Sequence, residues 1–350
     1  MLTLKQVSIP VLVRVKRNAL DRIGIYARRQ DFSRVVLLFS RDLQPALLAR
    51  MDAGLAGERI EVLQRLAVEE ASFEQAEAIF RNLPSTTDAV IGMGGGKALD
   101  VAKYVAFLAH LPYFAVPTSL SNDGFCSPQS SLTMDGRRRS LPSAIPFGVV
   151  LDTEVCLGAP EILWLSGVGD LAAKFTAGVD WKMAFHAKGV PVDDFAALVS
   201  DATVFQFIAR PVRDAEGVKL LGTALMLNGI AMALCGSSRP ASGSEHLISH
   251  ALDGLSRRPR LHGLQVGVAT YLVSLLQDQN SGQIANLFEA TGFWHAIAAD
   301  PFLRSEWLEA ARIAPSIKPG FYTVLSARDC LPEISRLLAT DSRLQACFVE

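Results

Sequence analysis

The sequence lacks a cysteine framework. Its five cysteines, Cys126, Cys156, Cys235, Cys330 and Cys347, form no CxxC pair and are odd in number. This pattern argues against a disulfide-stapled scaffold and against a structural zinc site. A reducing compartment is the simplest interpretation, so we expect a cytoplasmic protein.

The sequence also lacks an excess of charge of either sign. Lys and Arg total 34 against 35 Asp and Glu, and the formal net charge is -1. No field of the whole protein therefore attracts nucleic acid or an anionic membrane, and we expect neither as a partner. Any anionic ligand must be held by a few local groups.

Long apolar runs are nearly missing. The run at residues 9–13 is cut off by Arg14, Lys16 and Arg17, well short of a signal-peptide core. Residues 220–235 carry no charge and nearly reach transmembrane length, but glycine, threonine and asparagine dilute them and no second span accompanies them. We therefore expect a buried helix there and no membrane span.

What is present is an ordinary globular mixture, half apolar and a fifth charged, in 350 residues, about twice the usual length of one domain. The first half alternates β-rich runs with helical stretches, which predicts an α/β, Rossmann-like domain with a doubly wound parallel sheet. The predicted strands are 34–40, 60–64, 88–92, 113–116 and 147–151, the predicted helices are 71–83 and 97–110, and a hairpin with an Asp-Gly turn is predicted at 130–141.

From about residue 160 onward, long Ala- and Leu-rich stretches follow one another without strand-like runs. This texture predicts an all-α C-terminal domain. Gly158-Ala-Pro160 interrupts the pattern where the texture changes. We therefore expect an α/β domain over residues 1–157 and a helical domain over residues 158–350.

Three consecutive glycines, Gly94, Gly95 and Gly96, stand between a predicted strand and a predicted helix. Their unshielded N–H groups and the positive end of the helix suit a pyrophosphate. The string is neither GxGxxG nor GxxxxGK[ST], so a plain strand-to-helix turn remains the alternative. Asp100, in the first turn of the helix, either belongs to this site or interacts favourably with the helix dipole.

A polar segment, residues 116–128, follows the next predicted strand. It carries Thr118, Ser121, Asp123 and Ser127. Open α/β sheets bind ligands at the carboxyl ends of their strands, which is where this segment lies. Taken alone, it could equally be a turn rich in Ser, Asn and Asp.

Histidines and one carboxylate gather in the second half. Asp170 closes the string Gly167-Val-Gly-Asp, which we expect near the start of a helix. His246 and His250 are four residues apart and would share a helix face, and His262 follows them. Two or three histidines with a carboxylate can hold zinc, nickel, iron or manganese with a position left open. Any one of these histidines alone is more often a core or surface residue.

These segments together resemble the sn-glycerol-1-phosphate dehydrogenases, within the larger group of glycerol dehydrogenases, iron-type alcohol dehydrogenases and dehydroquinate synthases. The resemblance spans roughly residues 89–269 and rests on Gly94-Gly-Gly-Lys97 with Asp100, residues 117–127, Gly169-Asp170, and the string GSSRPASGSEH at 236–246 followed by His262-Gly263. The long string is specific, whereas the glycine segment is shared across the larger group.

The resemblance implies the dehydroquinate synthase-like architecture, with nucleotide binding in the first domain, metal and substrate binding in the second, and the active site in a cleft between them. It implies that NAD or NADP is bound by Gly94, Gly95, Gly96, Lys97, Asp100, Thr118, Ser121 and Ser127. It implies that one divalent metal, zinc first and nickel or iron as alternatives, is bound by Asp170, His246 and His262. Asp123 and Asp170 would contact the substrate.

Four further residues are our own candidates. Ser237, Ser238 and Arg239 are assigned to a substrate phosphate, because a guanidinium and hydroxyls suit that group. His250 is assigned to substrate positioning or proton relay, with a plain helix-face histidine as the alternative. The basic stretches 137–139 and 257–260 are interpreted as a solvated turn and a solvated loop, with phosphate or subunit contact as the alternative for the first.

The expected activity is the reversible reduction of dihydroxyacetone phosphate, a small phosphorylated three-carbon substrate, to sn-glycerol 1-phosphate. The alternatives are a dehydrogenase of glycerol or another polyol or its phosphate, a non-redox cyclising synthase, and, least favoured, a catalytically silent protein. Arg41 and Asp42 leave the choice between NAD and NADP open, because the first could admit a 2′-phosphate and the second could exclude it. We expect a homodimer or a higher homo-oligomer.

Overall fold

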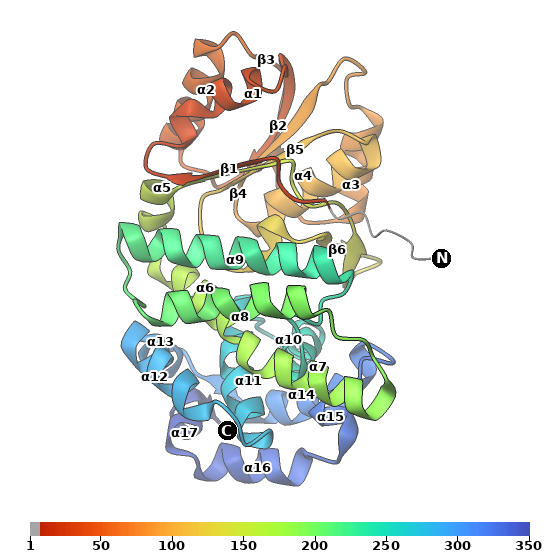
Figure 1. Cartoon of the computed structure of the whole chain (residues 1–350), viewed down its shortest axis with the longest axis vertical. Coiled ribbons are helices and arrows are strands. Elements are labelled where there is room, and N and C mark those ends of the chain that lie inside the picture. Colours follow the sequence, from red (N-terminus) through yellow and green to blue (C-terminus); the bar gives the residue numbers. More distant parts are fainter. Residues whose placement is uncertain (1–7) are drawn as a thin grey trace. The chain divides into compact units, whose positions relative to one another are not determined.

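The computed structural model describes residues 8–350, and their contacts divide the chain into two compact units (Figure 1). The first unit runs up to Ala159 and includes Asp214–Ala233. The second comprises Pro160–Arg213 and Leu234–Glu350. Of the expected helical domain, residues 158–159 and the segment 214–233 group with the α/β unit.

A parallel sheet of six strands forms the centre of the first unit, in the order β1-β8-β5-β4-β2-β3. The prediction of a doubly wound sheet is confirmed. Its strands are β1 (Leu12–Lys16), β2 (Arg34–Ser40), β3 (Glu61–Val68), β4 (Ala89–Gly94), β5 (Tyr113–Pro117) and β8 (Gly148–Asp152).

Helices cover both faces of this sheet because neighbouring side chains on a strand point to opposite faces. Leu37 packs in one apolar cluster with Leu55 of α2, whereas Leu38 packs in another with Val101 of α4. The helical segments before residue 160 are η1 (Leu20–Arg22), α1 (Ile23–Arg28), α2 (Pro45–Gly57), α3 (Phe73–Arg81), α4 (Gly96–Ala109), η2 (Asp123–Cys126) and α5 (Thr153–Leu157).

The predicted hairpin is present as β6 (Gln129–Met134) and β7 (Arg137–Pro142), which pair antiparallel. Its two turn residues, Asp135 and Gly136, have φ values of 52° and 71°. A two-residue turn with both φ values positive matches the right-handed twist of the strands, and an Asp-Gly pair accepts it readily.

Helix α9 (Ala215–Cys235) covers the apolar segment that the sequence marked as a buried helix. Gly222 faces Leu151, and Gly229 lies against the backbone of Cys126. Within residues 8–350, α9 is the one helix long and apolar enough to cross a membrane by length and composition, but 56% of its apolar window is buried in the protein. A helix in the core of a protein can be equally long and apolar. Its small residues explain why it packs closely on the α/β unit.

The second unit is helical apart from one pair of two-residue strands, β9 (Phe302–Leu303) and β10 (Phe348–Val349). The sequence missed this pair because two residues are too short to show a period. The helices of this unit are α6 (Glu161–Ala172), α7 (Lys174–Lys188), α8 (Asp194–Ile208), α10 (Ser244–Leu255), α11 (His262–Leu276), α12 (Ser281–Thr291), α13 (Phe293–Ala299), α14 (Arg304–Ile317), α15 (Val324–Ala327), α16 (Leu331–Thr340) and α17 (Ser342–Cys347).

Candidate metal and cofactor sites

Helices α6 and α11 cross with their backbones in almost direct contact. A Cβ on Gly169 would overlap the carbonyl oxygen of Gly263, and a Cβ on Gly263 would overlap that of Ser166. Glycine at both positions is what permits this approach. Because Gly169 precedes Asp170 and Gly263 follows His262, the crossing brings these two side chains together.

Asp170 lies in the last turn of α6, not near the start of a helix as the sequence suggested. The expectation was wrong because the helix begins at Glu161, directly after Pro160, and runs through the two glycines of the GVGD string. Those glycines do not mark a turn. They make room for α11, which the sequence pattern around them could not reveal.

Asp170, His246 and His262 converge on one point. Asp170 Oδ1 lies 3.5 Å from His246 Nε2 and 3.6 Å from His262 Nε2, and the three candidate ligand atoms all lie within 4.8 Å of one another. Ligand atoms about 2.0–2.1 Å from a tetrahedral ion lie about 3.4 Å apart. The three residues therefore fit a single divalent metal ion, with a fourth position left for water or a substrate oxygen.

The other nitrogen of each histidine is also occupied. His246 Nδ1 lies 3.0 Å from Glu245 Oε1, and His262 Nδ1 lies 3.1 Å from Ser249 Oγ. Nδ1 of each ring can donate to these oxygens, which leaves Nε2 as the lone-pair nitrogen facing Asp170. The two histidines are predicted from the sequence, whereas Glu245 and Ser249 are not.

The electrostatics of the cluster favour a cation. Burial lowers the pKa of His246, but its hydrogen bonds to Asp170 and Glu245 outweigh this and raise the pKa to about 10. Burial, together with the neighbouring charge on His246, lowers the pKa of His262 to about 3. Without an ion, the cluster therefore holds a proton on His246 between two carboxylates. A metal ion would take the place of that positive charge.

His250 lies beside the metal cluster, as the spacing on α10 predicted. Its ring stacks on that of His262 with centroids 5.5 Å apart, and its Nδ1 lies 3.8 Å from Asp253 Oδ2. Its side chain is 40% exposed. A half-exposed imidazole between solvent and the metal cluster has the placement that a proton relay needs.

The three phosphate candidates point toward a different segment. Arg239 is buried, its guanidinium carbon lies 3.6 Å from the centroid of Phe321, and its Nη1 donates to Tyr322 O at 2.6 Å. Ser237 Oγ accepts from Arg239 N, and Ser238 Oγ accepts from Lys318 Nζ at 3.1 Å. These contacts fix the 236–239 loop to residues 318–322, so the assignment to a substrate phosphate stays a prediction.

The glycine turn lies at the carboxyl edge of the sheet, between β2 and β4, where the strand order reverses. Gly94 has φ 136°, and a Cβ there would overlap the side chain of Ser40, whose Oγ accepts from Gly95 N at 3.0 Å. Gly95 is the N-cap of α4, and a Cβ on it would meet nothing within 4 Å. The space next to the Gly95 Cα is therefore open at the N-terminus of α4, and Lys97 is exposed beside it, an arrangement that leaves room for a pyrophosphate.

Asp100 lies behind the glycine turn, inside the unit. It is buried, and its Oδ1 lies 3.2 Å from Lys103 Nζ. Burial raises the pKa of Asp100, although Lys103 acts in the opposite direction. Lys103 is itself buried and donates to Gly124 O at 2.6 Å, which ties α4 to η2. The sequence missed Lys103, and its one signal was a lysine within an otherwise apolar stripe.

The polar segment after β5 is joined to the glycine turn. Thr118 N donates to Gly94 O at 3.0 Å, so the two predicted cofactor segments meet. Ser121 and Asp123 are partly exposed on the following loop. Ser127 is buried and its Oγ donates to Gln129 O at 3.0 Å, so its hydroxyl hydrogen is used within the loop.

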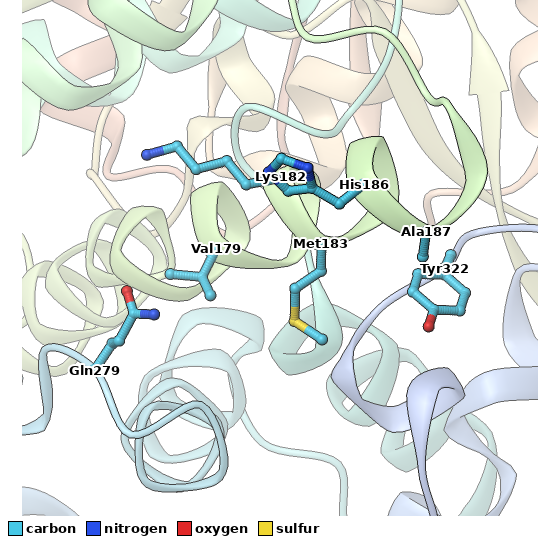
Figure 2. A pocket seen from close by; sticks show the side chains of 7 residues that line it. All are labelled: Val179, Lys182, Met183, His186, Ala187, Gln279 and Tyr322. Carbon is cyan, nitrogen blue, oxygen red and sulfur yellow. The ribbon is translucent and has the colours of Figure 1, made fainter.

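A hollow of about 450 Å³ also lies along α7 (Figure 2). None of its lining residues was predicted as a site residue. They are Val179, Lys182, Met183, His186, Ala187, Gln279 and Tyr322. The metal cluster and the glycine turn lie on other elements, so this hollow is not part of either candidate site.

Comparison with known proteins decides the family. The chain is 34% identical to the glycerol-1-phosphate dehydrogenase [NAD(P)+] of Aeropyrum pernix over 343 residues, which cover 95% of this chain and 97% of that protein. It is 33% identical to the enzyme of the same name from Pyrococcus furiosus, over 88% of this chain and 90% of that protein. The chain belongs to the glycerol-1-phosphate dehydrogenase family. The resemblance inferred from the sequence motifs is confirmed.

Two further comparisons relate this glycerol-1-phosphate dehydrogenase family member to a larger group. The sequence model of iron-containing alcohol dehydrogenases matches residues 14–160. The crystal structure of glycerol dehydrogenase from Schizosaccharomyces pombe superposes with a TM-score of 0.76 at 19% identity, covering 97% of this chain and 91% of that chain. The fold is therefore shared with that larger group, and NAD(P) and a divalent metal fit the family.

Two basic stretches of this family member have separate surroundings. Arg258 Nη2 lies 2.5 Å from Asp300 Oδ2, and Arg260 Nη2 donates to Pro301 O at 3.0 Å, so the stretch 257–260 is fastened to the segment before β9. The stretch 137–139 is exposed on β7, where Arg138 Nε donates to Ser131 Oγ at 2.7 Å. Arg41, the residue that could admit a 2′-phosphate, forms an ion pair with Glu69. The choice between NAD and NADP stays open.

Proposed function

We propose that this protein is a metal-dependent, NAD(P)-linked dehydrogenase that interconverts dihydroxyacetone phosphate and sn-glycerol 1-phosphate. The supporting observation is the three-ligand cluster of Asp170, His246 and His262 in a chain that is about one third identical to glycerol-1-phosphate dehydrogenases over nearly its whole length. Two imidazole nitrogens and one carboxylate oxygen suit zinc first, with nickel and iron as alternatives.

The metal ion, when bound, supplies Lewis-acid polarisation of the substrate ketone, and the nicotinamide supplies the hydride. Asp170, His246 and His262 would hold the ion. Glu245 and Ser249 hold the two imidazole rings. Because the ligands come from rigid helices, the site needs little rearrangement during the reaction.

His250 is the proposed group that moves the proton. Its imidazole stacks on that of His262, lies next to Asp253, and is the most exposed of the three clustered histidines. Reduction of a ketone requires one proton at the new hydroxyl oxygen, which His250 can donate and then recover from water. Asp123 is proposed to contact the substrate, and Ser237, Ser238 and Arg239 to bind its phosphate.

The proposed cofactor residues supply the other half of the chemistry. The glycine turn of Gly94, Gly95 and Gly96 binds the pyrophosphate through the backbone N–H groups that begin at Gly96, and Lys97 adds a positive charge beside it. Asp100 is buried and pairs with Lys103, and in this way it stabilises the helix that follows the glycine turn. Thr118, Ser121 and Ser127 line the ribose and the nicotinamide.

The test compares metal-free and metal-loaded protein with dihydroxyacetone phosphate and with dihydroxyacetone, in the presence of NADH or NADPH. We expect turnover with the phosphorylated ketone, loss of turnover after removal of the metal, and recovery on addition of zinc. His246→Ala should lose both metal and activity. His186→Ala, on the exposed surface of α7, is the matched control and should keep both. Full turnover by metal-free protein, or equal turnover of the unphosphorylated ketone, would contradict the proposal.

We also propose that the protein works as a homodimer or a higher homo-oligomer in a reducing cytoplasm. Three large apolar side chains of α8, Phe195, Leu198 and Phe205, are each more than half exposed, and such a stripe suits contact with a second copy. All five cysteines are free thiols in the structure, which suits a reducing compartment. Sedimentation analysis of the wild type and of Leu198→Glu tests the assembly: the variant should have the lower mass, and an unchanged mass would exclude α8 as the contact.

A further inference from the structure

We propose that Glu245 is a positioning residue that sets the metal affinity of the site through His246. The inference rests on the proposed metal site and goes further, because it gives a role to a residue that binds neither the metal nor the substrate. Its basis is a fully buried carboxylate in contact with the far side of a candidate metal ligand.

The carboxylate of Glu245 is held from three directions. Oε1 accepts from Gly243 N and lies 3.0 Å from His246 Nδ1, while Oε2 accepts from Thr176 Oγ1 at 2.8 Å. Each oxygen therefore has a defined partner. A side chain fixed in this way holds the imidazole ring in one orientation and in the tautomer with the proton on Nδ1.

Neighbouring residues on a helix do not normally face each other, so the contact between Glu245 and His246 needs a local cause. Both lie in the first turn of α10, where backbone N–H groups lack partners within the helix. Glu245 turns back to accept from Gly243 N, and this places its Oε1 beside His246. Asp180 Oδ2 accepts from Ser244 N at 2.7 Å and serves the same helix end separately.

The two candidate histidine ligands differ in the group that their Nδ1 atom contacts. His246 is backed by a carboxylate, whereas His262 is backed by the hydroxyl of Ser249, which also accepts from Gln265 Nε2 at 3.0 Å. A carboxylate partner increases the electron density on the ligating nitrogen more than a hydroxyl does. His246 should therefore be the stronger of the two ligands, and Glu245 should matter more to the metal than Ser249 does.

Charge balance supports the same role. Asp170 and Glu245 are both buried and both contact His246, while a third buried carboxylate, Asp180, interacts with Glu245 and accepts from Ser244 N and Val324 N. Loss of the charge on Glu245 would remove one of the two carboxylates that contact His246 and so reduce the negative charge that compensates a bound dication. Uncompensated buried charge is strongly unfavourable, so the ion should bind more weakly.

Glu245→Gln removes the charge and can keep the shape. The amide oxygen can still accept from Gly243 N and His246 Nδ1. The amide nitrogen can donate to Thr176 Oγ1, because that hydroxyl can donate instead to Ala173 O, 3.2 Å away. The variant therefore separates the electrostatic effect on the metal from the capping of α10.

The experiment measures zinc dissociation constants of chelator-stripped protein by competition with a chromophoric chelator, and the visible spectrum of the Co²⁺-loaded protein. For Glu245→Gln we expect a 10- to 100-fold weaker affinity for zinc, a Co²⁺ spectrum still typical of a tetrahedral nitrogen and oxygen set, and an unchanged melting temperature of the metal-free protein. Ser249→Ala should weaken zinc by a smaller factor. Asp180→Asn, which removes a second buried carboxylate at the same helix end that interacts with Glu245, should weaken zinc binding less than Glu245→Gln does.

Wild-type zinc affinity in Glu245→Gln would overturn the proposal. A weaker affinity accompanied by an equal loss of metal-free stability and a changed Co²⁺ spectrum would also overturn it, because Glu245 would then be a structural cap only. If Glu245→Gln does not fold, Glu245→Asp keeps the charge but withdraws it from Nδ1, and zinc affinity equal to wild type would refute the role. Failure of the proposed metal site is distinguishable, since the wild type itself would then bind no metal, and failure of the proposed substrate would leave the measured zinc affinities unchanged.

Discussion

Helix α9 and the predicted cofactor loop are joined by one close contact, which Gly229→Ala should break. A Cβ at this position would lie 2.8 Å from Ser127 N and closer still to the carbonyl of Cys126. Both neighbours are backbone atoms, so no side chain can rotate away, and η2 must move. Overpacking of this kind costs about 1–3 kcal/mol, and the better helix propensity of alanine offsets about 1 kcal/mol of it.

We therefore expect Gly229→Ala to lower the free energy of unfolding by up to about 2 kcal/mol. Because η2 lies between Ser121 and Ser127, the displaced loop should also raise the dissociation constant for NAD(P)H. Urea unfolding and fluorescence titration with NADH measure the two effects on the same protein.

Gly178→Ala is the matched control. Gly178 lies within α7, and a Cβ there would meet nothing within 4 Å. This variant should raise the free energy of unfolding by about 0.5–1 kcal/mol and leave cofactor affinity unchanged. If Gly229→Ala were as stable as Gly178→Ala and bound NADH like the wild type, the packing of α9 on the loop would not be as described.

Two further predictions concern carboxylates of the first unit that are paired with a basic side chain. The Arg34 guanidinium, together with hydrogen bonds from the Ser33 and Arg34 backbone, holds the pKa of Asp88 well below its usual range, so its contribution to stability is present above about pH 4 and is lost as the pH falls further. Asp88→Asn should therefore lower the free energy of unfolding by about 1–3 kcal/mol at pH 7, and the difference from the wild type should shrink in acid. Urea titrations at pH 7 and pH 3 measure both differences. A difference that stays constant between the two pH values would contradict the ionic origin of the effect. Lys103→Met removes the buried cation beside Asp100 and the donor to the carbonyl of Gly124, and it should lower the free energy of unfolding by about 3–5 kcal/mol and weaken NADH binding, measured by thermal unfolding and titration. A loss of stability no greater than that of Lys97→Met, on the exposed side of the turn, would refute it.

Much of the α/β unit could be predicted because its strands carry local signals. Strand β2 matches the predicted range, and the Asp135-Gly136 turn identified the hairpin. Strand β1 was missed because it is an edge strand, and its two basic residues, Arg14 and Lys16, looked like the end of an apolar run. In the strand, Arg14 is half-buried and Lys16 is exposed, and they alternate with Val13 and Val15. Such a pattern is ambiguous over five residues.

The partners of the site residues could not be predicted from the sequence. The identity of Asp170, His246 and His262 as a set came from the resemblance, and the structure brings them together. Glu245 and Lys103 escaped notice because their roles depend on residues far away in the chain, Thr176 for the first and Gly124 for the second. A motif shows which side chains are present, but only the packing of α6 against α11 shows what they face.

The stereochemistry of the product tests the central claim most directly. Metal-loaded protein is incubated with dihydroxyacetone phosphate and reduced nicotinamide cofactor, and the glycerol phosphate formed is resolved by chiral analysis while the loss of reduced cofactor is followed by absorbance. The account predicts one equivalent of cofactor oxidised for each equivalent of sn-glycerol 1-phosphate. Formation of sn-glycerol 3-phosphate, or consumption of a substrate with no net change in nicotinamide absorbance, would contradict it.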